Sequence, residues 1–234
     1  YYLRKCITRK NGEVKMASEK RAQKKEQIIY TAIKMLEQSS YNDVRIEDIA
    51  QKLEVVKSNI FYYFPSKGIL YLNVLEKLHS DIIERFILEV NQTSIKNIVD
   101  FKKLIMKLTD IYIRDYITLI KLSIESTRIF SECKREHILQ YNKAVNSLED
   151  RLQSIIIEKF NGFTRNEVFY IFEVQEHFLR GYYQDMIQNA EYAIADDGDI
   201  AWERLSLYEF RVTRMLRFFL DGMIYEKDKN TLDK

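Results

Sequence analysis

Hydrophobic residues recur along most of the chain at the three- and four-residue spacing of amphipathic helices. A clear early example is the set Ile28, Ile29, Ala32, Ile33 and Leu36, which falls on one side of a helix. Glycine and proline, at 6 and 1 of 234 residues, rarely interrupt this pattern. The pattern predicts an all-α protein. We expect about nine helices, over residues 18–38, 46–53, 57–64, 67–90, 96–114, 117–131, 135–160, 165–193 and 201–226.

The composition excludes several other classes of protein. All-β folds, Rossmann folds and P-loop sites all need more glycine than this chain contains. No uninterrupted apolar run is longer than five residues, as from Val168 to Phe172, whereas a membrane span needs about 20. Cys6 and Cys133 lack the spacing of a metal or redox site. We therefore expect free thiols in a reducing cytoplasm and no membrane partner.

The segment 46–64 contains two short predicted helices separated by a tight turn. Its apolar residues can form a small core, in which Ala50 leaves room for the second helix to cross closely. These residues are Ile49, Ala50, Leu53, Val55, Ile60 and Phe64. The arrangement is that of a helix-turn-helix, whose second helix must protrude far enough to enter the major groove. The residues left on the outer side, which can bond base edges or phosphates, are Lys57, Ser58, Asn59, Tyr62 and Tyr63.

At these residues the sequence resembles the TetR family of transcriptional regulators. The resemblance is carried by Ile49-Ala50, Val55, Ile60, the aromatic block Phe61–Phe64 and Pro65-Ser66-Lys67. It implies that Lys57 opens the recognition helix, that the aromatic block closes it near the DNA backbone, and that Lys67 lies on a phosphate. Arg45 stands where the family usually has threonine and can add a phosphate contact. The predicted DNA-binding residues are Arg45, Lys57, Ser58, Asn59, Phe61, Tyr62, Tyr63 and Lys67.

Three residues depart from the family pattern. Glu54 stands in place of the usual turn glycine, Val56 in place of a capping serine, and Phe61 in place of a tyrosine. The first adds negative charge near DNA, the second removes about 1 kcal/mol of helix capping, and the third removes a hydroxyl. These changes favour an alternative function, a protein-binding adaptor or co-regulator of the same fold with a degenerate DNA reader. The remaining basic residues favour DNA binding.

Positive charge is concentrated at the N-terminus. Residues 1–25 contain nine Lys and Arg and two Asp and Glu, although the whole chain carries a net charge of +2. Such an arm fits a polyanion such as DNA, and a solvated tail is the alternative. We expect a non-native or disordered arm over 1–15 and a helix-turn-helix DNA-binding domain over 16–72. The resemblance implies a helical ligand-binding and dimerisation domain over 73–234.

The second predicted domain is rich in aromatic residues, with thirteen Phe and Tyr between positions 101 and 183. Rings with a polar tip suit a cavity for a small aromatic or amphipathic effector; ordinary core packing is the alternative for each ring. The predicted ligand-binding residues, two of them polar, are Tyr112, Tyr116, Glu125, Phe130, Tyr141, Phe172, Gln175 and Tyr182. No catalytic, metal-binding or cofactor-binding motif is found, so we predict no enzymatic activity and no cofactor. A carrier of apolar ligands is a further alternative, which leaves the segment 46–67 unexplained.

A single helix-turn-helix reads too few bases for useful specificity, so we expect a homodimer on a palindromic operator. The last two long helices are the predicted interface. Its residues are Val174, Gly181 and Asp185 on the first helix and Leu205, Val212, Leu216, Phe219 and Met223 on the second. The sequence therefore predicts a cytoplasmic, DNA-binding transcriptional regulator. We expect a repressor relieved by a small-molecule effector, with activation as the alternative.

Overall fold

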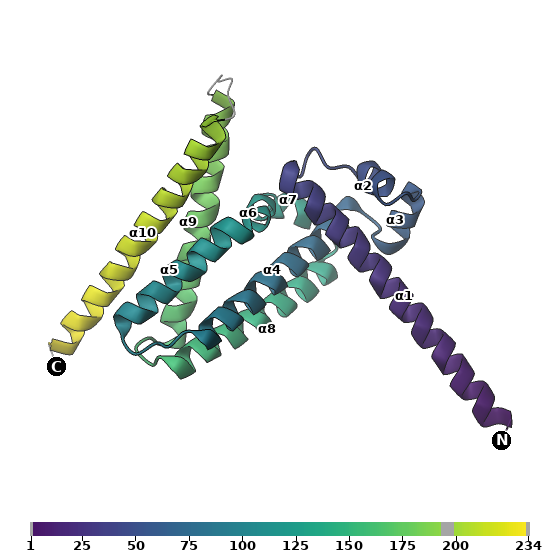
Figure 1. The fold of residues 1–234 in the computed structure, drawn as a ribbon, viewed down its shortest axis with the longest axis horizontal. Helices are drawn as coiled ribbons and strands as arrows, with labels where there is room; N and C mark the ends of the chain where they lie inside the picture. Colours follow the sequence, from purple (N-terminus) through teal and green to yellow (C-terminus); the bar gives the residue numbers. More distant parts are fainter. Residues whose placement is uncertain (1, 193–198, 233–234) are drawn as a thin grey trace.

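The computed structural model describes residues 2–192 and 199–232, and side chains over 18–188 and 205–227. These residues form ten α-helices and no strand (Figure 1). The helices are α1 (Tyr2–Gln38), α2 (Ile46–Lys52), α3 (Lys57–Tyr63), α4 (Lys67–Gln92), α5 (Ile98–Asp115), α6 (Ile117–Ile124), α7 (Ser126–Ser131), α8 (Arg135–Lys159), α9 (Arg165–Tyr192) and α10 (Asp199–Leu232). The predicted all-α fold is confirmed.

The two largest differences from the predicted helices concern the pair α6 and α7 and the start of α1; α10, at 199–232, is also longer than the predicted 201–226. The helix expected over 117–131 is divided into α6 and α7, because the chain bends at Glu125, whose φ and ψ are −84° and 2°. No glycine or proline marks this bend in the sequence, so hydrophobic spacing alone did not reveal it. The first helix begins at Tyr2 rather than Ser18. The residues expected to form a disordered arm are thus helical from Tyr2 onward, and their non-native origin stays a prediction.

Helices α1, α2 and α3 surround one apolar cluster at the N-terminal end of the molecule (Figure 1). α1 contributes Ile28 and Ala32, α2 contributes Ile49, and α3 contributes Ile60, all of them buried. Most of the core predicted for the helix-turn-helix is therefore confirmed. The two exceptions lie half-buried at its edge and are Leu53 and Val55.

Helix α4 connects the N-terminal helices to the rest of the chain. It contacts α1 near its start and lies along α8 (Figure 1). Its predicted apolar face, Leu70, Val74 and Leu78, is buried. Helices α5 and α6 contact both α4 and the pair formed by α9 and α10, which lie side by side. Within the described residues, no helix is long and apolar enough to span a membrane.

Polar contacts at α7 tie the N-terminal helices to the second domain. The backbone N–H of Gly68, in the first turn of α4, donates to Oε2 of Glu132 at 2.9 Å. Arg128 on α7 donates to Oδ1 of Asn42. A β-carbon at Gly68 would clash with Cβ of Glu132 and lie 3.0 Å from the carbonyl oxygen of Ile129. The close approach of α7 to α4 therefore requires glycine at this position.

Candidate nucleic-acid interface and internal cavity

The turn between α2 and α3 positions the candidate reading helix. At the start of α2, the N–H of Arg45 donates to Oδ2 of Asp48 at 2.9 Å. After α2, Glu54 adopts a φ of 54°, in the left-handed region that favours glycine. The N–H of Val55 then donates to the carbonyl of Ala50 at 3.0 Å. This bond closes the turn and fixes the direction in which α3 leaves it.

Helix α3 has one buried side and one open side. Ile60 is fully buried, whereas Tyr62 is 66% exposed. Val56 precedes the helix without a side-chain cap, as the loss of the capping serine predicted. Tyr63 is half-buried. The predicted DNA-binding residues of this helix that are exposed are Lys57, Ser58, Asn59, Phe61 and Tyr62.

Two of the predicted phosphate-binding side chains are paired with carboxylates of α2. Lys57 forms an ion pair with Glu47, and Nε of Arg45 lies 3.3 Å from Oδ2 of Asp48. The hydrogen bond from Lys57 holds the pKa of Glu47 below its usual value. The hydrogen bond from Arg45 does the same to the pKa of Asp48. Both cations remain at the surface, so a phosphate can compete with these carboxylates for them.

Lys67 is directed into the protein. Its Nζ donates to the carbonyl of Tyr41 at 2.7 Å and lies 4.2 Å from the centre of the Tyr41 ring. Burial lowers the pKa of Lys67. The structure thus uses this ammonium to join the start of α4 to the loop after α1, and it does not bring Lys67 together with the exposed residues of α3.

Basic residues of α1 lie beside α3, although they are not among the DNA-binding residues predicted from the sequence. Lys20 and Lys24 line a shallow depression together with Asn59 and Tyr62. The guanidinium carbon of Arg21 lies 5.3 Å from the centre of the Tyr62 ring. The excess positive charge of residues 1–25 was the signal for these side chains, but only the packing of α1 shows that they flank the reading helix.

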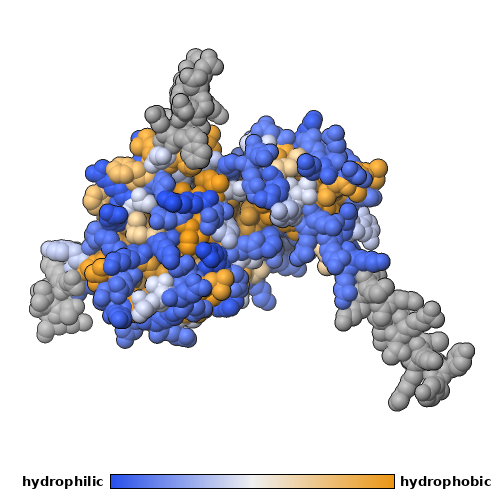
Figure 2. Space-filling view, viewed as in Figure 1, coloured by the Kyte–Doolittle hydropathy of each residue, from blue (hydrophilic) through white to orange (hydrophobic). Residues whose placement is uncertain are grey.

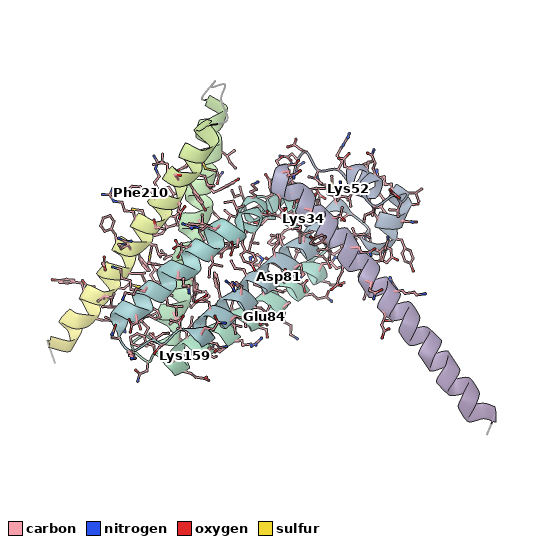
Figure 3. The ribbon with its side chains drawn as sticks, viewed as in Figure 1. Lys34, Lys52, Asp81, Glu84, Lys159 and Phe210 are labelled. Carbon is pink, nitrogen blue, oxygen red and sulfur yellow. The ribbon has the colours of Figure 1, made fainter. Side chains whose placement is uncertain are left out.

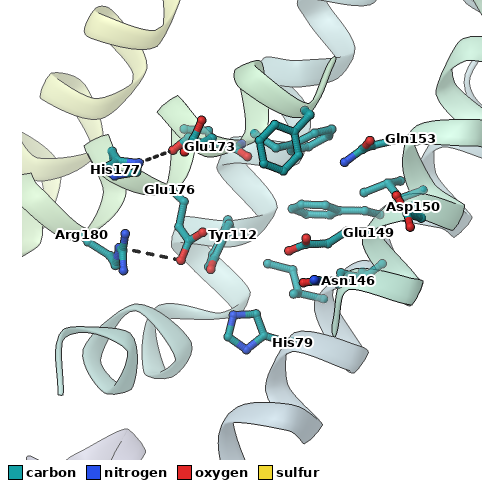
Figure 4. Close-up of a pocket in the computed structure, with 17 residues that line it drawn as sticks. His79, Tyr112, Asn146, Glu149, Asp150, Gln153, Glu173, Glu176, His177 and Arg180 are labelled. Atoms are coloured by element: carbon teal, nitrogen blue, oxygen red, sulfur yellow. Dashed lines mark hydrogen bonds and ion pairs between the residues drawn. The ribbon is translucent and has the colours of Figure 1, made fainter. Parts of the chain in front are cut away.

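A cavity of about 560 Å³, partly open to solvent, lies between α4, α5, α8 and α9. Figure 4 shows that the labelled side chains of α8 face those of α5 and α9 across it. Its lining residues are His79, Ile82, Ile83, Phe86, Tyr112, Asn146, Glu149, Asp150, Leu152, Gln153, Phe169, Phe172, Glu173, Gln175, Glu176, His177 and Arg180. The volume is in the usual range for small-molecule sites.

Three of the eight predicted ligand-binding residues line this cavity: Tyr112, Phe172 and Gln175. The amide of Gln175 donates to Oγ1 of Thr109 at 2.7 Å, which fixes its orientation. Part of the aromatic cluster therefore lines open space, and that these residues bind a ligand stays a prediction.

The structure does not bring the other five predicted residues into the cavity. The Tyr116 hydroxyl donates to a backbone carbonyl of α4 at 3.2 Å. The Tyr141 hydroxyl lies behind the lining, 3.2 Å from Nδ1 of His79, and the Phe130 ring packs against the Tyr141 ring. Glu125 forms the bend between α6 and α7. The fifth, Tyr182, lines a separate shallow depression on α9.

The acidic residues of the cavity were not predicted. They are Glu149, Asp150, Glu173 and Glu176. In the sequence they are typical of solvated helix faces, so no local signal distinguished them. Burial, with Glu176 and Asp150 nearby, raises the pKa of Glu149 from 4.5 to about 7. Among the described residues, no group of three or more His, Cys, Asp and Glu is arranged to hold a metal ion.

The outer face of α9 and α10 differs from the predicted dimer interface. Val212 and Leu216 are fully buried within the chain, because this side of α10 packs on α9 and α5. Phe210 and Phe218 are instead 54% and 57% exposed. Phe210 points away from the rest of the chain (Figure 3). Hydrophobic side chains lie among hydrophilic ones over α10 (Figure 2). A β-carbon at Gly181 would meet nothing within 4 Å, so no contact inside the chain requires this glycine.

The fold and the two sites define a class of protein, in which a helix-turn-helix is followed by a helical domain with a partly open cavity. Residues 28–74 match the family described as bacterial regulatory proteins, tetR family. Over this region, which contains the helix-turn-helix, the chain is similar to that family.

Two curated relatives match the same region. The HTH-type transcriptional regulator RutR of Escherichia coli (strain K12) is 40% identical over 55 residues, which are 24% of this chain and 26% of RutR. The HTH-type transcriptional regulator YuxN of Bacillus subtilis (strain 168) is 32% identical over 65 residues, or 28% of this chain and 22% of YuxN. The similarity therefore spans about a quarter of the length of these relatives.

Solved structures resemble the chain over most of its length. The fatty acid degradation regulator FadR from Bacillus halodurans has a TM-score of 0.52 at 15% identity, covering 82% of this chain and 97% of FadR. A protein from Saccharomonospora viridis, described as a transcriptional regulator in complex with choline, has a TM-score of 0.51 at 16% identity. The match covers 87% of this chain and 96% of that protein. At this identity the likeness concerns the fold, which extends through the second domain.

Proposed function

We propose that the chain is a transcriptional regulator that binds a palindromic operator as a homodimer and is released by a small aromatic or amphipathic effector. The observation that carries the proposal is the open side of α3, with its exposed polar and aromatic residues beside the basic face of α1. A protruding helix of this kind fits the major groove, and its amide and hydroxyl side chains suit base edges. A protein-binding adaptor of the same fold is not favoured, because the scaffold and these side chains are intact.

A homodimer is supported by the outer face of α9 and α10. Two copies related by a two-fold axis would cover Phe210 and Phe218 in a four-helix packing. Two reading helices would then face half-sites of one operator.

Release by an effector is supported by the position of α4. The helix begins at Lys67 beside α3 and contributes His79 and Phe86 to the cavity wall. A ligand that separates α4 from α8 and α9 would move the N-terminal helices and change the spacing of the two reading helices. A 100-fold loss of DNA affinity requires about 2.7 kcal/mol of coupling between the two sites. The choline complex of a protein with this fold also supports a small-molecule site. The proposal includes no catalytic step and places the protein in the cytoplasm with its DNA.

The test is binding to DNA fragments from around the protein's own gene, measured by fluorescence anisotropy over a range of salt concentrations. Lys57→Ala should weaken binding several-fold and reduce the salt slope by about two, one for each protomer of the dimer. Glu47→Gln should strengthen binding, because it frees Lys57 from its ion pair. Lys143→Ala, on α8 and exposed, is the matched control and should change neither value. Absence of any sequence preference at low salt would contradict the proposal and favour the adaptor.

A further inference from the structure

The cavity between α4, α5, α8 and α9 combines an aromatic wall with an acidic one. The centre of the Phe86 ring lies 6.3 Å from the centre of the Phe172 ring, and these two rings are nearly parallel. It lies 6.2 Å from the centre of the Tyr112 ring, which is steeply inclined to it. On α8, Glu149 faces Tyr112 and Glu176 across the open space (Figure 4). Ring faces and carboxylates both attract positive charge.

The acidic side chains of the cavity are not equally paired. Arg180 lies 3.7 Å from Glu176, and Arg165 lies 3.4 Å from Asp150. In the described part of the chain, the half-buried Glu149 side chain has neither an ion pair nor a hydrogen bond. Within the described residues, Glu149 and the exposed Glu173 are therefore left without a cation of the protein, and Glu149 is the more buried of the two.

Two other polar groups of the lining reach the open space and have no hydrogen-bond partner among the described residues. Gln153 and Tyr112 are only 5% and 7% exposed. No residue in the described ranges hydrogen-bonds the Gln153 amide or the Tyr112 hydroxyl, and Figure 4 shows the amide directed into the cavity. These two groups are therefore available to hydrogen-bond the polar atoms of a ligand in the cavity.

We propose that this cavity binds an organic cation, whose positive charge lies against Glu149 and whose apolar part lies among Phe86, Phe172 and Tyr112. This inference rests on the proposed function, because it names the chemical class of the effector. Arg180 does not oppose it, since Glu176 already neutralises that guanidinium.

Protonation of Glu149 gives the proposal a second readout. The titratable and charged groups around it are His79 on α4, Tyr112 on α5, Asp150 on α8, and Glu173, Glu176, His177 and Arg180 on α9. With the pKa of Glu149 at about 7, the carboxyl is about one tenth ionised at pH 6 and about nine tenths at pH 8. A permanent cation should therefore bind about tenfold more tightly at pH 8 than at pH 6. Near pH 7, its binding should release a proton from Glu149.

The experiment uses the whole protein and three probes: benzyltrimethylammonium, its neutral isostere neopentylbenzene, and the anion phenylacetate. Calorimetry, in buffers of different ionisation enthalpy, gives affinity and proton release. We expect the cation to bind at least tenfold more tightly than either other probe. Glu149→Gln should lower the affinity for the cation at least tenfold and abolish its pH dependence. Glu158→Gln, an exposed site on the same helix, is the control and should change neither.

Three results would overturn the proposal: equal binding of the neutral isostere, unchanged affinity in Glu149→Gln, or no binding of the cation. The DNA titration without any probe tests the proposed function separately. If DNA binding fails while the cation binds through Glu149, the ligand class stands and the regulator proposal falls. If DNA binding holds and the cation does not bind, the regulator proposal stands and the proposed ligand class falls.

Discussion

Single residues set the local geometry of both sites, and several act against the stability of the chain. Glu54 occupies a left-handed backbone conformation that glycine adopts without strain. Glu149 places a carboxyl group in a partly apolar cavity without a cation of the protein beside it. Such departures from the most stable choice are expected where a turn or a binding site takes precedence over stability.

Glu54→Gly should raise the free energy of unfolding by about 1 kcal/mol, because a non-glycine residue pays roughly 1–2 kcal/mol for the left-handed conformation. Part of this gain is offset by the greater freedom of glycine in the unfolded chain. Urea denaturation measures the change. Glu54→Ala keeps the strained β-carbon and serves as the control. If both variants stabilise the chain equally, the charge of Glu54, and not its backbone conformation, is responsible.

The raised pKa of Glu149 predicts how stability depends on pH. In the unfolded chain this carboxyl has a pKa of 4.5, and in the folded chain about 7. Between these values the folded state holds a proton that the unfolded state has lost, so stability falls as pH rises through this window and is then level. Glu149→Gln should therefore stabilise the protein on the order of 2 kcal/mol more at pH 8 than at pH 4.5. Denaturation at both pH values, with Glu158→Gln as reference, tests this; an equal effect at the two values would contradict it.

At the scale of helices, the important features are the shape of α3 and the junction of α4 with α7. The hydrophobic pattern predicted α3 and its buried Ile60 correctly, because a short helix that crosses another needs an apolar inner side. It did not predict α7 as a separate helix, because Glu125 bends the chain without a glycine or proline. The bend brings Glu132 back onto the start of α4, where it meets Gly68.

Gly68→Ala should destabilise the protein by about 1–3 kcal/mol, the usual cost of overpacking a close contact. The added β-carbon would clash with Cβ of Glu132 and crowd the carbonyl of Ile129, so α7 must move away from α4. Thermal unfolding measures the loss. Combining Gly68→Ala with Glu132→Gly removes the clash with Cβ of Glu132. In a double-mutant cycle, the double variant should recover part of the lost stability. A neutral Gly68→Ala variant would show that α7 is free to shift.

At the scale of the whole molecule, the exposed apolar side chains of α9 and α10 need a partner surface. Phe210 and Phe218 lie eight residues, or about two helical turns, apart on the open side of α10. Large aromatic side chains of this kind are enriched at the centres of interfaces. The same face includes Gly181, where the chain itself leaves open space.

Phe210→Glu should raise the dissociation constant of the dimer at least about 100-fold, because two buried rings are lost and two charges are placed at the interface. Leu139→Glu is the control, since this residue is equally exposed on α8. Sedimentation velocity at micromolar protein should show monomers for the first variant and dimers for the second. A dimeric Phe210→Glu variant would place the interface elsewhere.

The sequence by itself determined the all-helical fold, the helix-turn-helix and most of its core, because these follow from local spacing of apolar residues and from scarce glycine. It also identified the exposed residues of α3, since the inner side of a short helix defines the outer one. Tertiary structure alone decided the rest. It turned Lys67 inward onto Tyr41, buried Val212 and Leu216 within the chain, and gathered acidic residues of two distant helices around one cavity. These outcomes depend on how helices pack against one another, and a charged side chain on an amphipathic helix carries no local sign of the neighbour it will face.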